Sequence, residues 1–299
     1  MSGAAAAAPV RRLAVIGCGL MGGSFARALR ARGLLQQAVG VARSAEARAR
    51  AVALGVVDEA TDDPAAAARG ADVVLLAVPV AATEATLRAL APALADDALL
   101  MDVGSTKADV VAAARAALDA ARLARFVPAH PIAGKEKAGV EHACAELYRG
   151  AQVIVTPLPE TAADAQRRAQ ALWEAVGARV RTMTPQAHDA ALAAVSHLPH
   201  LLAFAAVHAL AQQPDGARFL ELAGPGFRDF TRIAASDPDV WRDILHANAA
   251  EVRAQAAAFR AALDAFEAAL AEPARLRLLI DEASRVRRAW APAGAPPSP

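Results

Sequence analysis

Hydrophobic and polar positions divide the chain into two stretches with different patterns. Up to about residue 184, short apolar runs that predict strands alternate with stretches that predict helices, and several of these helices end at glycine. The predicted strands are Leu13–Ile16, Ala38–Ala42, Asp72–Val78, Leu99–Val103, Phe126–Ala129, Gln152–Thr156 and Arg179–Thr182. This alternation is typical of a parallel sheet that is covered by helices on both faces.

Beyond Thr184 the strand pattern stops and only helices are predicted. They cover Gln186–Gln212, Val240–Leu270 and Pro273–Trp290, with breaks at Pro214–Gly216 and Ala235–Pro238. We therefore expect an α/β domain at 11–184 and an all-helical domain at 185–290, between disordered tails at 1–10 and 291–299. The helix at Gln186–Gln212 is apolar around more of its circumference than a small domain needs to bury, which predicts a homodimer.

Composition narrows the class of protein. The 299 residues are 56% hydrophobic and 21% charged, and 32 cationic residues against 31 acidic ones leave a net charge of +1. This balance gives no reason to expect nucleic acid or a membrane surface as a partner. Two cysteines, Cys18 and Cys144, exclude a disulfide framework and offer no zinc spacing. An alanine tract in place of a signal peptide, and no long uncharged apolar window, predict a cytoplasmic protein without a membrane span.

A glycine-rich loop directly follows the first predicted strand and opens a helix. It contains Gly17, Gly19 and Gly22, together with Leu20 and Met21. The first glycine permits a tight turn, the second lets the backbone approach a pyrophosphate, and the third lets the helix pack on the strand. A purely structural turn is the alternative, but the position after a strand and before a helix favours a Rossmann-type dinucleotide-binding domain.

The end of the second predicted strand bears on the choice of dinucleotide. An acidic residue usually stands there and binds the ribose hydroxyls of NAD, but this chain has Ala42, followed by Arg43 and Ser44. An arginine favours the 2′-phosphate that an acid would repel. We therefore expect NADP as the cofactor, with NAD possible. The alternative is an ordinary surface arginine at the edge of a loop.

Polar residues also follow two later strands, at the edge of the sheet where ligands bind. Asp102-Val103-Gly104-Ser105-Thr106-Lys107 leads from a strand into a helix, and His130 stands between another strand and Pro131. A histidine in that position is a candidate general base, because its pKa lies near the operating pH.

Two groups of charged or titratable residues lie in the predicted helical domain. His197 and His200 are three positions apart in an apolar helix, on either side of Pro199. Arg228 and Arg232 are four positions apart, so a helix would present both to a dianion. Buried core histidines and a solvated charged face with Asp229 are the alternatives for these two groups.

Taken together, these segments resemble the prephenate/arogenate dehydrogenase family of tyrosine biosynthesis. The matching stretches run from about residue 13 to residue 250, and their shared order is more specific than any single motif. They are VIGCGLMGGS, DVGSTK, HPIAGKEKAGVEHA, VSHLPH and GFRDFTRIAASDPDVW. The resemblance implies a dinucleotide-binding domain followed by a helical domain that forms much of a dimer interface, with prephenate or arogenate bound between them.

The resemblance also implies a reaction and the residues that perform it. His130 would accept the proton of the ring C4 hydroxyl while hydride passes from C4 to the nicotinamide, and the ring then loses CO2 and becomes aromatic. Ser105 would hydrogen-bond the same hydroxyl. Arg232 would bind a substrate carboxylate, and His200, with His197 beside it, would support the substrate. Aromatisation drives such a reaction without a metal or a covalent nucleophile.

Three further residues are candidates for the mouth of the site on the same grounds. Glu136 and Arg228 would lie near the entrance, and Lys135 stands where members of the family vary, so it bears on the choice between prephenate and arogenate. Pro225 departs from a stretch that is often all glycine in the family, and Ala42 departs from the usual acid.

Two other classes of protein share some of these features. The β-hydroxyacid dehydrogenases also combine a glycine loop with a helical domain, but their chemistry depends on a lysine in the first long helix, and Gln186–Gln212 has none. A binding module that senses NADP would need the glycine loop but not His130, Ser105 and Arg232. An assay with prephenate and oxidised cofactor distinguishes an enzyme from such a module.

Overall fold

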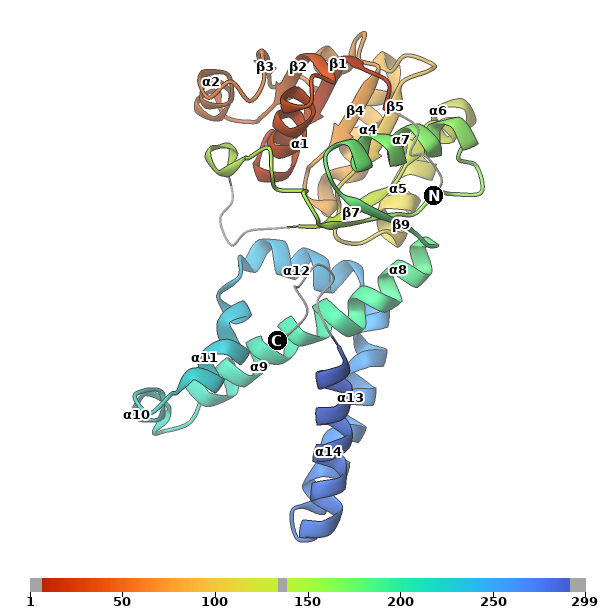
Figure 1. Cartoon of the computed structure of the whole chain (residues 1–299). Coiled ribbons are helices and arrows are strands. Elements are labelled where there is room, and N and C mark those ends of the chain that lie inside the picture. Colours follow the sequence, from red (N-terminus) through yellow and green to blue (C-terminus); the bar gives the residue numbers. More distant parts are fainter. Residues whose placement is uncertain (1–6, 134–138, 291–299) are drawn as a thin grey trace.

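The computed structural model describes residues 7–133 and 139–290 (Figure 1). Residues 10–182 form an α/β region, and residues 185–289 form a helical region below it in the figure. The predicted tails lie largely outside the described residues, and Lys135 and Glu136 lie outside them as well. The architecture of an α/β region followed by a helical one confirms the predicted fold class.

The first sheet has six strands that are all parallel. Apolar runs buried on both faces form its central strands, as expected for a parallel sheet covered by helices. Its order reverses between β1 and β4, which is where a doubly wound sheet binds ligands. In spatial order the strands are β3 (Glu59–Thr61), β2 (Leu35–Val41), β1 (Val10–Ile16), β4 (Val73–Leu76), β5 (Leu99–Asp102) and β6 (Phe126–Val127).

A second, three-stranded sheet contains the strands that follow, so the single sheet expected from the pattern was wrong at this point. The predicted strand at Phe126–Ala129 divides at Pro128, and the chain leaves the first sheet there. β7 (Ala129–Ile132) pairs antiparallel with β8 (Gln152–Val155), and β8 pairs parallel with β9 (Arg179–Thr182). His130 is thereby placed opposite Ile154, and β7 lies at the side of the α/β region that faces the helices below (Figure 1).

Helices cover both faces of the first sheet. One face packs against α1 (Leu20–Ala31) and α7 (Ala163–Ala175), where the rings of Phe25 and Trp173 lie 4.7 Å apart. The opposite face packs against α3 (Pro64–Ala68), α4 (Thr83–Leu90) and α5 (Ala108–Ala117). The remaining elements of this region are α2 (Ala45–Ala53), α6 (Ala120–Ala124) and the 3₁₀ turns Val80–Ala82, Ala91–Ala93 and Val140–His142.

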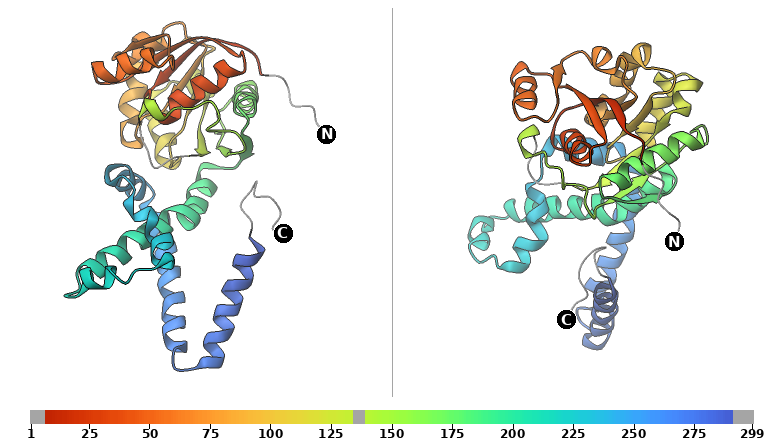
Figure 2. Two further views of the ribbon diagram at one scale, coloured as in Figure 1. Left: turned by 60° about the vertical axis from the view of Figure 1, so that its left-hand side comes forward. Right: turned by 45° about the horizontal axis from the view of Figure 1, so that its top comes forward.

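The helical region consists of arms that project from a common centre (Figure 2). The predicted helix at Val240–Leu270 is in fact two helices, which meet at Asn248. The elements are α8 (Pro185–Leu192), a π-helical turn (Ala193–His197), α9 (Leu198–Ala211), α10 (Gly216–Leu220), α11 (Pro225–Thr231), a 3₁₀ turn (Arg232–Ala235), α12 (Pro238–Ala247), α13 (Ala249–Ala269) and α14 (Pro273–Ala289).

The run from Pro185 to Ala211 is long and apolar enough, by length and composition alone, to cross a membrane, and 28% of its apolar window is buried within the chain. Two polar residues near its start, His188 and Asp189, are buried at 0% and 4% exposure and contact the α/β region. These contacts fix the start of the run against the first domain of the protein.

Candidate active site

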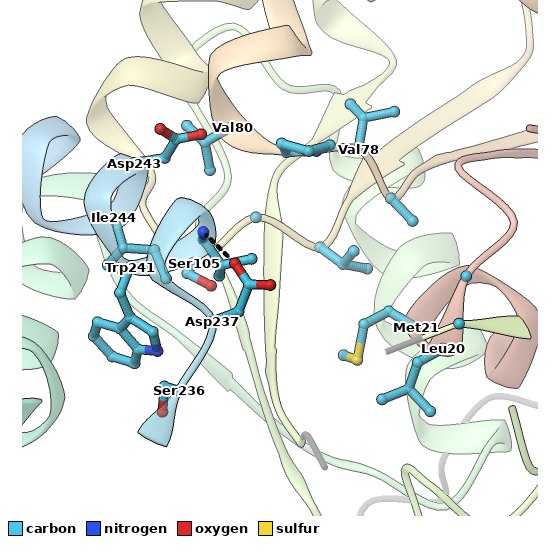
Figure 3. Close-up of a pocket in the computed structure, with 17 residues that line it drawn as sticks. Leu20, Met21, Val78, Val80, Ser105, Ser236, Asp237, Trp241, Asp243 and Ile244 are labelled. Carbon is cyan, nitrogen blue, oxygen red and sulfur yellow. Dashed lines mark hydrogen bonds between the residues drawn. The ribbon is translucent and has the colours of Figure 1, made fainter. Parts of the chain in front are cut away.

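A cavity of about 460 Å³ lies where the two regions meet (Figure 3). Its floor is formed by the segments that follow β1, β4 and β5, the carboxyl ends of strands on either side of the point where the sheet order reverses. Helix α12 closes the other side with Trp241 and Ile244. Gly19, Leu20, Met21 and Ser105, all of them predicted site residues, line this cavity.

The glycine loop has the shape that a dinucleotide requires. Gly17 has a φ of +97°, and a Cβ there would lie 2.3 Å from the carbonyl oxygen of Ala77. A Cβ on Gly22 would lie 2.5 Å from a side-chain carbon of Val15, so this glycine lets α1 pack on β1. Nothing lies within 4 Å of the same position at Gly19. The amino end of α1 therefore faces the cavity without a side-chain cap, as a pyrophosphate site needs.

Cys18, within the same loop, is a packing residue. Its side chain is 6% exposed, and burial raises the pKa of the thiol to about 11. The thiol therefore stays neutral at physiological pH, in keeping with a small residue that fills the turn.

The loop after β2 exposes its predicted cofactor residues to solvent. Arg43 is exposed, and Ser44 caps α2, since its Oγ accepts a hydrogen bond of 3.1 Å from the amide of Ala47. Arg48, which sequence reasoning missed, donates to the carbonyl oxygens of Ala42 and Arg43 at 3.0 and 2.8 Å. Its guanidinium thus braces the loop, and it also pairs with the carboxylate of Asp62 at 3.2 Å.

His130 is the first member of a buried chain of hydrogen bonds. Its Nδ1 lies 2.8 Å from Nε2 of His188, and Nδ1 of His188 lies 2.7 Å from Oδ1 of Asp189. The Asp189 carboxylate also accepts the backbone amides of Lys107 and Ala108, at 2.9 and 2.8 Å. The dipeptide His188-Asp189 therefore connects α8 of the helical region to the base and to the start of α5.

The charges in this chain determine which nitrogen of His130 carries a proton. Burial alone raises the pKa of Asp189, but hydrogen bonds from His188 and from the two amides outweigh it and lower that pKa below its usual value. The carboxylate therefore accepts the Nδ1 proton of His188, which leaves Nε2 of His188 to accept the Nδ1 proton of His130. Nε2 of His130 is left with a lone pair.

Burial also keeps His130 neutral. Desolvation is the largest cause that brings its pKa well below the usual value, and electrostatic interactions with His188, Lys107 and His197 lower it further. An imidazole in this environment is unprotonated at neutral pH and is able to accept a proton, provided that a proton-bearing group reaches Nε2.

Asn248, at the junction of α12 and α13, extends the network to His197. Its Nδ2 donates to the carbonyl oxygen of Asp189 at 2.8 Å and to Nδ1 of His197 at 3.0 Å. An amide nitrogen has only donors to offer, so Nδ1 of His197 is an acceptor and that ring is neutral. Desolvation, the largest cause, brings the pKa of His197 to about 4, which agrees with this tautomer.

His200 reaches the cavity through an aromatic contact. Its ring stacks on Trp241 with centroids 3.4 Å apart and planes 17° apart, and Nδ1 donates to the carbonyl oxygen of Ser196 at 2.9 Å. Desolvation, the largest cause, lowers the pKa of His200, and the charge of Arg232 lowers it as well. Arg232 therefore lies within electrostatic reach of His200, on the 3₁₀ turn that precedes α12.

Arg228 lies apart from this cluster. Its side chain is 74% exposed and donates from Nε to the carboxylate of Asp229 at 3.2 Å, which is the local pairing that the sequence left open as an alternative. Besides Arg48, the residues that sequence reasoning missed are His188, Asp189, Asn248 and Trp241. The His-Asp pair eight residues before His197 was the available signal, because two adjacent polar residues in an apolar helix need buried partners.

Comparison with known proteins decides the family. The model for the prephenate dehydrogenase nucleotide-binding domain matches residues 25–182, and the model for the prephenate dehydrogenase dimerization domain matches residues 184–279. The chain belongs to the prephenate dehydrogenase family. The two matches meet between residues 182 and 184, where β9 ends and α8 is about to begin.

Individual members of the family are similar along most of the chain. Cyclohexadienyl dehydrogenase of Zymomonas mobilis is 38% identical over 241 residues, which are 80% of this chain and 81% of that protein. Prephenate dehydrogenase of Bacillus subtilis is 36% identical over 78% of this chain and 62% of its own length. The crystal structure of prephenate dehydrogenase from Aquifex aeolicus with hydroxyphenyl propionate and NAD+ has a TM-score of 0.86 at 36% identity, covering 93% of this chain and 97% of that one.

Proposed function

We propose that this chain oxidatively decarboxylates prephenate or arogenate with NADP, or less efficiently NAD, as hydride acceptor, and that His130 is the general base. The family supports the reaction. The observation that carries the assignment of the base is the hydrogen-bonded chain His130–His188–Asp189, which pairs Nδ1 of His130 and leaves its Nε2 to accept a proton.

The residues of the chain account for the proton. The O–H bond of the C4 hydroxyl breaks and its proton passes to Nε2 of His130, while Ser105 hydrogen-bonds the same oxygen. The imidazolium so formed keeps its Nδ1–H bond to His188, whose other nitrogen is paired with the Asp189 carboxylate. When the ring carboxylate leaves as CO2 and the ring becomes aromatic, His130 can return the proton to the phenolate oxygen. The products are 4-hydroxyphenylpyruvate from prephenate, or tyrosine from arogenate, and CO2.

The cofactor would bind along the glycine loop. Gly17, Gly19 and Gly22 with the uncapped amino end of α1 fit a pyrophosphate, and the segment after β5 with Ser105 fits the reactive end. Bound NADP supplies the acceptor for the hydride that leaves C4. Arg43 and Ser44 would contact the 2′-phosphate, on a loop whose carbonyl groups Arg48 already holds.

The substrate would lie against the helical region. Arg232 would bind a carboxylate, and His200, held flat against Trp241, would orient it. His197, fixed as a neutral ring by Asn248, would form the wall behind them. Lys135, Glu136 and Arg228 are kept as candidates for the mouth of the site on the resemblance alone, and the contact between Arg228 and Asp229 makes Arg228 the least favoured of the three.

The helical region also supports a homodimer. The second family match is named for dimerisation, and large apolar side chains are exposed along α14 and the turn before it. We infer that a second copy of the chain covers them. A cytoplasmic location fits a biosynthetic enzyme of this kind.

A direct assay tests the proposed activity. Purified protein is mixed with prephenate or arogenate and with NADP or NAD, and both the absorbance of the reduced nicotinamide and the release of CO2 are followed. We expect the two signals to rise together in equal amounts. Tight cofactor binding without turnover of either substrate would instead identify a binding module.

A further inference from the structure

A buried ion pair lies directly behind the proposed base. Asp102 is the last residue of β5, and Lys107 stands immediately before α5. The two side chains form a salt bridge and are 4% and 0% exposed. Burying two charges costs desolvation free energy, so we expect such a pair to hold some part of the chain in place.

The pair holds both main-chain polar groups of Ala129, the residue before His130. Oδ1 of Asp102 accepts the Ala129 amide at 2.9 Å, and Nζ of Lys107 donates to the Ala129 carbonyl oxygen at 2.9 Å. Ordinary sheet pairing does not fix this part of the chain to β5. β6 pairs with β5 only at Phe126 and Val127, and β7 then turns away to β8. The ion pair replaces that missing ladder.

The same carboxylate shapes the loop that carries Ser105. Oδ2 of Asp102 accepts the amide of Gly104 at 2.7 Å, and a Cβ at Gly104 would lie 2.9 Å from that oxygen. A side chain at this position would therefore push against the carboxylate oxygen that accepts the Gly104 amide. One carboxylate thus links the strand of the base to the loop of Ser105, the two groups assigned to the C4 hydroxyl.

The choice of lysine is informative in this chain. Its 32 cationic residues include three lysines, and Lys107 is the one that lies within the described residues. An ammonium group is a compact charge whose three hydrogens can point in different directions, here to a carboxylate and to a carbonyl oxygen. A planar guanidinium would need more room than a fully buried site provides.

We propose that Asp102 and Lys107 are positioning residues for proton transfer: they fix the main chain at Ala129 so that His130 stays aligned between His188 and the substrate hydroxyl. This inference rests on the proposed role of His130 as the base. It assigns the pair an effect on turnover that a partly buried ion pair remote from the site would lack.

The test uses Lys107→Met and the double variant Asp102→Asn with Lys107→Met in the full-length protein. Lys107→Met leaves a buried carboxylate unpaired, so it should lower both stability and kcat, the latter by at least about tenfold, since small displacements of a reacting group are costly. The KM for cofactor should stay within about twofold, because the glycine loop is untouched. The acidic limb of kcat/KM should move to higher pH, because the charge of Lys107 lowers the pKa of His130.

The double variant separates positioning from folding. Without an unpaired charge it should recover much of the stability in a denaturant titration, but nothing in it donates to the Ala129 carbonyl oxygen, so kcat should stay low. Recovery of kcat together with stability would overturn the proposal, as would wild-type kcat in either folded variant. If Lys107→Met fails to fold, the double variant decides alone.

Arg168→Met is the matched control. Asp72 stands immediately before β4, at the end of that strand remote from the cavity. Its carboxylate accepts the amides of Arg11 and Arg12 at 3.2 and 2.7 Å. Arg168 donates to the Asp72 carboxylate and to the Asp72 carbonyl oxygen. This variant should lose stability and keep its kcat. His130→Asn in parallel tests the proposed function itself: loss of turnover there, with no loss in folded variants of the pair, would refute the positioning role only.

Discussion

The two regions of the molecule bury their apolar side chains to very different degrees. In the α/β region, Leu13, Leu75, Leu99 and Phe126 are all completely buried, and two clusters close over both faces of the sheet. In the helical region, Leu222, Leu270, Leu278 and Val286 are between 67% and 82% exposed. The α/β region folds around its own core, whereas the helical region leaves apolar side chains for a partner to cover. The groups proposed for catalysis lie where the α/β region meets the helical region.

This contrast explains how the site is assembled. The α/β region supplies His130 from within β7 and Ser105 from the segment that follows β5. The helical region supplies His188, Asp189 and Trp241, which reach the site from helices that are only partly packed. Substitutions at His130, and at the His188–Asp189 pair behind it, should therefore affect chemistry, whereas substitutions elsewhere in the helical region should affect substrate binding and assembly.

The largest effect is expected for His130→Asn. Removal of a positioned general base typically lowers kcat by about 10²–10⁴-fold, and the glycine loop should still bind cofactor normally. Steady-state kinetics, with cofactor binding followed by fluorescence quenching, checks both statements. His208→Asn, an exposed histidine on α9, is the control and should keep its kcat. A folded His130→Asn protein with most of its kcat would remove this residue from the mechanism.

Arg232→Ala should act on the substrate rather than on the cofactor. Loss of a hydrogen bond to a charged group costs about 1.5–3 kcal/mol, which corresponds to roughly 10- to 150-fold in affinity. We expect KM for prephenate or arogenate to rise by that order, with the KM for NADP nearly unchanged. Arg218→Ala, an exposed arginine on α10, is the matched control. A rise in the cofactor KM would place Arg232 in the nucleotide site instead.

The sequence predicted best those elements whose local pattern follows directly from their surroundings in the fold. The central strands are continuous apolar runs because both their faces are covered, and the glycine loop is visible because few other residues fit Gly17 and Gly22. The short edge strand β3 (Glu59–Thr61) was missed, since an edge strand of three residues that are partly exposed has no apolar run.

The other omissions come from contacts between distant segments. Pro128 gives no local sign that the chain changes sheets there, and the junction of α12 and α13 at Asn248 contains neither proline nor glycine. His188 and Asp189 look like polar positions on a helix until the fold places His130 and the start of α5 against them. Periodicity describes one element at a time, so it cannot show which polar residues will become partners.

The preference for cofactor should be the next largest effect, and it depends on the α/β region alone. Arg43 can add a charge-assisted contact to a 2′-phosphate, and Ala42 provides no acid to hold the ribose of NAD. Exposure of Arg43 weakens that contact, so we expect NADP to be favoured by about tenfold in kcat/KM. Ala42→Asp with Arg43→Gln should reverse the preference, and Arg50→Gln on the exposed side of α2 should not. A wild-type preference for NAD would show that Arg43 does not reach the cofactor.

The smallest expected effect is a twofold difference in molecular mass. It tests whether a second copy of the chain covers the helical region. Leu270, at the turn between α13 and α14, is 69% exposed, and Leu278, within α14, is 71% exposed. A protein gains about 25 cal/mol for each Å² of apolar surface that it buries. Light scattering at low micromolar concentration should therefore give about twice the chain mass of 30.7 kDa. Leu270→Glu with Leu278→Glu would bury charges in the interface and should shift the protein toward the monomer. Val52→Glu, at an apolar side chain of the α/β region that is 42% exposed, should not. A wild-type monomer with full activity would contradict the dimer and would leave the exposed side chains of the helical region to some other partner.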